Sequence, residues 1–285
     1  MSRALAADGH RDLRTPRLAT DRALRSSPVD STPTSTLPLV RKVLPDDSAP
    51  RAAGRAGLVP DAILADVPGR ILAIGGFSLG TRFDDVVLEL ARGPRVLFVP
   101  TAAGDPQQMV TAFYASFARR AEPSHLTFNP WPPADLREVV LAQDVIYVSG
   151  GNTANALAVW RVHGFDAIVR EAWERGALLC GWSAGMICWY EASVTDSFGP
   201  ALAGMRDGLG LLPGSACPHY DGEARRRPVY TGLVRDGFPP GIACDDAAAA
   251  LYEGTELVEV VAREADARAY GVGPEGEEPL DARRL

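Results

Sequence analysis

From residue 70 onward, short apolar runs alternate with longer stretches that have helical spacing. The apolar runs are expected to form buried strands at residues 70–74, 95–99, 145–149 and 177–182. The stretches between them are expected to form helices at residues 84–91, 106–121, 134–142 and 153–175. Apolar strands that are separated by helices are typical of a parallel sheet covered on both faces. The sequence therefore predicts an α/β fold with three layers, built around a doubly wound and mostly parallel sheet.

The first 60 residues differ in composition from the rest of the chain. They contain seven of the 23 prolines, none of the Phe, Trp or Tyr residues, and ten Lys and Arg against six Asp and Glu. Such a segment buries too little apolar surface to offset the entropy lost on ordering it. We expect residues 1–60 to form a disordered or loosely attached extension, with a basic docking or targeting arm as the alternative. Residues 61–285 are expected to form one α/β domain.

Charge and cysteine content exclude several classes of function. The formal net charge is −7, which gives no reason to expect nucleic acid or an anionic membrane as a partner. No apolar run approaches the roughly 18–20 residues that a membrane helix needs. The four cysteines show no spacing typical of a metal site. We therefore expect a cytoplasmic protein that uses neither a metal nor an organic cofactor.

Residues 181–185 have the sequence GWSAG, and they lie between an apolar strand and a helix-like run. This is the pattern of a nucleophile elbow, in which a serine occupies a tight strand-to-helix turn and flanking glycines let the backbone pass. The elbow would raise the Ser183 hydroxyl at the carboxyl end of the sheet, where α/β active sites gather. The alternative is a tight turn with an inert serine.

A second glycine loop, at residues 149–153, also follows a predicted strand and precedes a helix. Paired glycines allow backbone N–H groups to approach a ligand closely. In the alternative interpretation Asn152 or Thr153 caps the following helix. The two interpretations are compatible.

A serine nucleophile needs a neighbouring base, and the chain has four histidines. His10 lies in the predicted extension, His163 ends a helical run, and the surroundings of His125 are uninformative. His219 follows an apolar segment and Pro218, which restricts the backbone before it. We therefore expect His219 to be the base, with a structural histidine as the alternative.

A carboxylate behind the imidazole would fix its tautomer and stabilise the imidazolium. Asp196 follows the predicted helix after Ser183, while Asp245 and Asp246 follow a strand-like segment. The pattern of the residues does not rank these three candidates.

Three motifs occur in order along the chain, VSGGN at 148–152, GWSAG at 181–185 and CPHY at 217–220. With these motifs the chain resembles the peptidase E family, the S51-type serine peptidases, from about residue 70 to its end. That group includes aspartyl dipeptidases and, more distantly, cyanophycinases. The resemblance implies a class I glutamine-amidotransferase-like fold in which serine replaces the usual nucleophilic cysteine. The extension, the more apolar segment after GWSAG and the shorter segment after CPHY depart from the family pattern.

The resemblance also implies roles for individual residues. Ser183 would be the nucleophile and His219 the base, and the backbone N–H groups of Gly151 and Ala184 would form the oxyanion hole. Among the carboxylates it favours Asp196, with Asp245 and Asp246 as alternatives. Asn152 and Arg225 are assigned to substrate binding, Arg225 because a guanidinium can bind a substrate carboxylate through two hydrogen bonds. A solvated run of arginines is the alternative for Arg225.

The function implied is a serine peptidase that hydrolyses short peptides, above all dipeptides with an N-terminal aspartate, through an acyl-enzyme on Ser183. Two alternatives stay open. One is an amidohydrolase or esterase for other substrates, such as β-aspartyl or cyanophycin-like peptides, and the other is a non-catalytic binding module. The expected partner is a small peptide, and the resemblance allows a homodimer.

Overall fold

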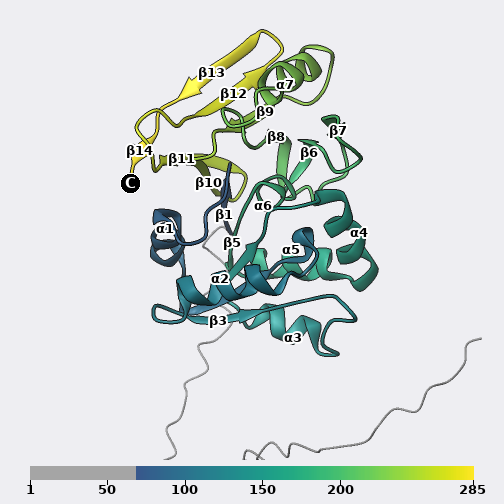
Figure 1. Cartoon of the computed structure of the whole chain (residues 1–285), viewed down its shortest axis with the longest axis vertical. Coiled ribbons are helices and arrows are strands. Elements are labelled where there is room, and N and C mark those ends of the chain that lie inside the picture. The colour runs from purple at the N-terminus through teal and green to yellow at the C-terminus, as the bar shows by residue number, and fades with distance from the viewer. Residues whose placement is uncertain (1–68) are drawn as a thin grey trace, which may run out of the picture. The chain divides into compact units, whose positions relative to one another are not determined.

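The computed structural model describes residues 69–285, which form two β-sheets with helices packed against them (Figure 1). The α/β class predicted from the sequence is confirmed. The predicted extension, residues 1–60, and the first eight residues of the predicted domain lie outside the described residues. No helix within residues 69–285 is long and apolar enough to cross a membrane.

The first sheet has eight strands in the order β14-β11-β10-β1-β5-β4-β2-β3. Their bounds are β1 Arg70–Ile74, β2 Arg95–Val99, β3 Glu122–His125, β4 Val145–Val148, β5 Leu178–Trp182, β10 Ala248–Glu253, β11 Glu256–Ala262 and β14 Arg283–Arg284. Strands β1, β5, β4, β2 and β3 are parallel, and β10 pairs with β1 in the antiparallel direction. The carboxyl ends of β1, β2, β4 and β5 therefore meet at one edge, where the loops that follow them lie close together.

The helices of the described residues are α1 Arg82–Leu90, α2 Gln107–Phe117, α3 Leu136–Leu141, α4 Thr153–His163, α5 Phe165–Glu174, α6 Ala184–Ile187 and α7 Arg226–Arg235, and a 3-10 turn spans Thr101–Ala103. The single helical stretch predicted for residues 153–175 is two helices. Gly164 separates them because it adopts a left-handed conformation, with φ of 70°, that ends α4.

Alternate residues of the central strands face opposite sides of the first sheet. In β1, Ile71 and Ala73 belong to one core cluster, and Leu72 and Ile74 belong to another. Helices α1 and α2 contribute to the cluster of Leu72, and helices α3 to α6 contribute to the cluster of Ile71. The predicted three layers are therefore present, with all four residues of β4 buried between them.

The second sheet was not predicted from the sequence. It has six strands in the order β13-β12-β9-β8-β6-β7. Their bounds are β6 Tyr190–Thr195, β7 Ala203–Met205, β8 Leu212–Cys217, β9 Gly241–Cys244, β12 Ala269–Gly273 and β13 Gly276–Leu280. The prediction of one sheet for residues 61–285 is thus incomplete, because these strands are short and contain many Gly, Ala and Ser residues, which give little strand signal.

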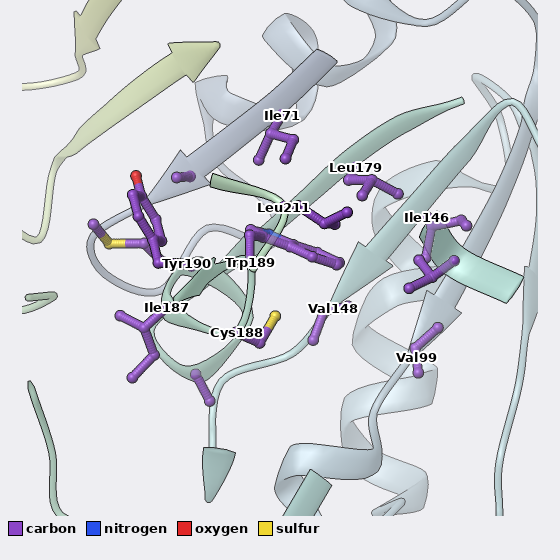
Figure 2. Close-up of a cluster of buried hydrophobic side chains, with 14 of the residues drawn as sticks. Ile71, Val99, Ile146, Val148, Leu179, Ile187, Cys188, Trp189, Tyr190 and Leu211 are labelled. Carbon is purple, nitrogen blue, oxygen red and sulfur yellow. The ribbon is translucent and has the colours of Figure 1, made fainter. Parts of the chain in front are cut away.

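A shared hydrophobic core joins the two sheets. Figure 2 shows part of it, with Leu179 of β5 in the same cluster as Trp189 and Tyr190, which lie at the start of the second sheet. Trp189 is fully buried and Tyr190 is 2% exposed. Because α6 leads directly from the end of β5 into this core, the turn that contains Ser183 is anchored on both sides.

Candidate active site

Ser183 occupies a strained turn between β5 and α6. Its backbone has φ of 55° and ψ of −110°, a conformation that residues with a side chain rarely adopt. Its backbone N–H donates to the carbonyl of Ile74 at the end of β1. A Cβ on Gly181 or Gly185 would lie 2.5 or 2.3 Å from the carbonyl oxygen of Val148 in β4. The two glycines of the elbow are therefore required by the close approach of the neighbouring strand.

His219 lies within hydrogen-bonding distance of this serine. The distance from His219 Nε2 to Ser183 Oγ is 2.8 Å. His219 follows β8 and Pro218, and it also has a positive φ of 53°. The N–H of Tyr220 donates to the carbonyl of Cys244, which ties the segment after β8 to the end of β9. The second sheet thus holds the imidazole over the serine of the first.

The carboxylate that contacts His219 belongs to Asp246. Its Oδ1 lies 2.5 Å from His219 Nδ1, and its backbone N–H donates to Oδ1 of Asp221 at 2.8 Å. Two glycines leave room for the carboxylate, because a Cβ on Gly76 would lie 2.6 Å from Oδ1 and a Cβ on Gly222 would lie 2.2 Å from Oδ2. The turn between β9 and β10 therefore presents Asp246 to the imidazole.

Asp196, which the family resemblance favoured for this position, does not contact His219. It is exposed at the end of β6, whereas the carboxylate on His219 Nδ1 is that of Asp246, one of the two alternatives. Asp245, the other alternative, is 2% exposed and its Oδ2 accepts a hydrogen bond from the backbone N–H of Arg268. The assignment of Asp196 is thus corrected to Asp246.

The Asp245 carboxyl has an unusual environment. Its Oδ1 has no hydrogen-bond partner within the described part of the chain. The pKa of this carboxyl is raised from 3.8 to about 6, mainly by burial and in part by the charges of Asp221 and Asp246, while the hydrogen bond from the Arg268 N–H and the charge of Arg227 oppose the shift. Asp245 therefore binds a proton more tightly in the folded chain than in water.

The expected oxyanion donors lie beside the serine. Gly150 precedes Gly151 in the loop after β4, and a Cβ on Gly150 would lie 3.3 Å from the Cβ of Ser183. Gly151 has φ of 135° and packs against the carbonyl of Ala102. Within residues 69–285, the backbone N–H groups of Gly151 and Ala184 form no hydrogen bond. Neither N–H group is therefore committed to an acceptor within the described residues.

The two residues assigned to substrate binding contact the same segment, residues 196–200. Asn152 caps α4, since its Oδ1 accepts from the N–H of Asn155, and its Nδ2 donates to the carbonyl of Ser197 at 2.9 Å. Arg225 is exposed and donates to the carbonyl of Pro200 at 2.9 Å. Asn152 therefore caps the helix, as the alternative interpretation had it. Asn152 and Arg225 both donate hydrogen bonds to backbone carbonyls of the segment 196–200.

The three consecutive arginines have different environments. Arg226 is 3% exposed and is paired with Glu223, and Arg227 stacks on the ring of Tyr220. Arg225 forms no ion pair with any residue of the described range 69–285. Of the three, Arg225 is the one that forms no ion pair, and its charge acts on Glu223 only from a distance, where it helps to lower the pKa of that carboxyl.

Sequence reasoning missed the aromatic residue beside the elbow. Phe77 is 53% exposed, and its ring packs edge-on against the ring of Trp182, with centroids 5.4 Å apart. The paired glycines Gly75 and Gly76 directly after β1 indicate a third glycine loop, but they give no indication of the aromatic residue that follows them. The pair lies against the turn of Asp245 and Asp246.

The geometry suits nucleophilic catalysis by a serine. A hydroxyl, an imidazole and a carboxylate lie in line at hydrogen-bonding distances, next to two free backbone N–H groups. Within the described residues no group of three or more His, Cys, Asp or Glu side chains could hold a metal ion.

Comparisons with known proteins match the chain to one family of peptidases. The model of peptidase family S51 matches residues 72–260. The uncharacterized peptidase YgaJ of Bacillus subtilis (strain 168) is 44% identical over 205 residues, which cover 70% of this chain and 88% of that protein. Peptidase E of Shewanella denitrificans is 30% identical over 132 residues, which cover 43% of this chain and 56% of that protein.

Two solved structures share the fold. A peptidase from an acI-B1 actinobacterium superposes with a TM-score of 0.59 at 19% identity, over 78% of this chain and 97% of that one. A putative peptidase E protein from Listeria monocytogenes EGD-e superposes with a TM-score of 0.51 at 19% identity, over 69% of this chain and all of that one.

Proposed function

Because the chain belongs to peptidase family S51 and is therefore a peptidase, we propose that it hydrolyses short peptides through an acyl-enzyme on Ser183. The observation that carries the proposal is the 2.8 Å contact between His219 Nε2 and the hydroxyl of a serine in a strained turn. Strained backbone of this kind clusters at functional sites, because the surrounding structure must hold it in place.

In the proposed mechanism Ser183 Oγ attacks the scissile carbonyl carbon while its proton moves to His219 Nε2. The Asp246 carboxylate holds the proton on Nδ1 and stabilises the imidazolium. The carbonyl oxygen becomes negatively charged and accepts hydrogen bonds from the N–H groups of Gly151 and Ala184. Collapse of the intermediate breaks the C–N bond, and the leaving amine takes the proton from Nε2. Water then hydrolyses the ester on Ser183 by the same steps.

We further propose that the first residue of the preferred substrate is aspartate, with dipeptides as the simplest members of the class. An acidic side chain needs a cation, and Arg225 supports this role because it forms no ion pair with a carboxylate within the described residues. Its contact with Pro200 uses one of the five N–H donors of a guanidinium, which leaves others for a substrate.

We also propose that the protein works in the cytoplasm. The four cysteines, Cys180, Cys188, Cys217 and Cys244, are buried and free. Free thiols are typical of a reducing compartment.

The test is hydrolysis of a panel of Asp-X, Glu-X and neutral dipeptides by the wild type and by the Ser183→Ala and Arg225→Gln variants. We expect cleavage of Asp-X that is lost in Ser183→Ala and reduced in Arg225→Gln. Cleavage of neutral dipeptides in preference to Asp-X would contradict the aspartate assignment and leave the nucleophile in place. Full activity of Ser183→Ala would contradict the mechanism.

A further inference from the structure

An open groove of about 740 Å³ lies along α4, and neither the mechanism nor the aspartate assignment uses it. Twelve residues line it: Thr101, Ala102, Ala103, Gly104, Asp105, Phe128, Asn129, Asn152, Asn155, Ala158, Val159 and His163. Its volume is within the range of roughly 300–1,000 Å³ that is typical of binding sites for drug-sized ligands.

The groove begins at the loop that touches the nucleophile. Gly150 packs against Ser183, and Gly151 packs against the carbonyl of Ala102, which lines the groove. The backbone N–H of Asn152, another lining residue, donates to the same carbonyl at 2.7 Å. A peptide held with its scissile carbonyl at Gly151 would therefore lie at the entrance of the groove.

The groove is unsuited to the acidic first residue of the proposed substrate. None of its twelve lining residues, all in the described part of the chain, is Arg or Lys, and one is the carboxylate Asp105. Arg225 does not line it. The groove and the residue assigned to the N-terminal aspartate are thus separate, which leaves the groove for the other end of a peptide.

The walls offer groups that suit a peptide backbone. Side-chain amides of Asn129 and Asn155 both donate and accept hydrogen bonds, and both residues are exposed. Phe128 also lines the groove but is only 5% exposed, so the accessible polar groups of the walls are mainly these side-chain amides. Side-chain amides can pair with both the N–H and the C=O groups of a peptide backbone.

We propose that this groove binds the second and later residues that follow the scissile bond of a peptide substrate. The enzyme then favours peptides of three or more residues over dipeptides. The inference rests on the proposed function and deepens it, because it changes the substrate class from dipeptides to longer oligopeptides. Binding energy from residues remote from the scissile bond raises kcat/KM for the longer substrates.

The experiment compares a dipeptide with the tripeptide and tetrapeptide that extend it at the C-terminus, using the full chain. Ala158→Trp fills the groove from the exposed face of α4. Val162→Trp is the matched control, because Val162 is on the same helix, is 79% exposed and does not line the groove. We expect kcat/KM of the wild type to rise about tenfold from dipeptide to tetrapeptide. Ala158→Trp loses this rise and hydrolyses the dipeptide within about twofold of the wild type, while Val162→Trp behaves as the wild type.

Binding separates this proposal from the catalytic one. In a Ser183→Ala background, calorimetry reports the Kd of the same peptides whether or not the wild type cleaves them. We expect the tetrapeptide to bind more tightly than the dipeptide, and Ala158→Trp to remove that difference. Equal affinity for both peptides, or equal losses in the two Trp variants, would overturn the groove assignment. Absence of hydrolysis together with length-dependent binding would overturn the proposed function alone.

Discussion

Replacing Asp246 by asparagine tests the carboxylate that the structure places on His219. The change keeps the size of the side chain and removes its charge. Asp246 Oδ1 lies 2.5 Å from His219 Nδ1, so the negative charge is next to the imidazolium that forms when Ser183 attacks. The loss of this charge raises the energy of the transition state relative to free enzyme and substrate.

The size of the effect follows from distance and exposure. Two unit charges about 4 Å apart attract by ~1 kcal/mol in water and by ~4 kcal/mol at an effective dielectric constant of 20. The Asp246 side chain is 47% exposed and that of His219 is 21% exposed, so the loss lies between these limits. Since about 1.4 kcal/mol corresponds to a factor of ten in rate, we expect kcat/KM to fall by about 5-fold to 10³-fold. This is less than the ~10⁴-fold known for a fully buried triad carboxylate.

The assay is steady-state hydrolysis of the best dipeptide of the panel, with Asp196→Asn as the matched control. Asp196 is exposed and does not contact His219, so we expect Asp196→Asn to keep kcat/KM within about twofold of the wild type. The reasoning is refuted by the reverse pattern, in which Asp196→Asn loses activity and Asp246→Asn retains it.

Two further predictions concern the surroundings of this carboxylate. In Gly222→Ala the new Cβ would lie 2.2 Å from Asp246 Oδ2, so the carboxylate must move by more than ~1 Å. We therefore expect the activity to fall as it does in Asp246→Asn, while the thermal midpoint of unfolding changes little. Unchanged activity would show that the carboxylate can shift without leaving the imidazole. The pKa of Asp245 is about 6 in the folded chain, against an ordinary value of 3.8 for the unfolded chain. The folded state therefore binds the proton more tightly, and the free energy of unfolding falls as the pH rises from about 4 to about 6. This loss of unfolding free energy is about 2–3 kcal/mol. Urea unfolding at pH 4 and pH 7.5 should show the loss in the wild type and not in Asp245→Asn. The same pH dependence in both proteins would contradict the raised pKa of Asp245.

The part of the fold that depends on local patterns could be predicted. Strands β1 and β2 have the bounds expected from their apolar runs, because each run is buried on both faces and is bounded by polar or turn residues. The second sheet could not be predicted in this way. Strand β13, with the sequence GEEPL, has few residues that favour a strand, and it is held in place by pairing with β12.

In the candidate site, too, the residues set by local sequence could be predicted and those set by distant contacts could not. Ser183 was found because its elbow is encoded in adjacent residues, and the structure places His219 beside it. Asp246 was left among the alternatives because its position depends on contacts between distant segments. It is set by the antiparallel pairing of β10 with β1 and by the hydrogen bond from its N–H to Asp221. Sequence spacing carries no information on such contacts, and Asp196 was preferred through resemblance alone.

The most direct test of the central claim is labelling of the folded protein with a fluorophosphonate, followed by intact mass measurement and peptide mapping. We expect one label per chain, located on Ser183, with labelling lost in Ser183→Ala and strongly slowed in His219→Ala, because the imidazole activates the hydroxyl. An unlabelled Ser183 in folded wild-type protein, or a label that survives in Ser183→Ala, would contradict the account.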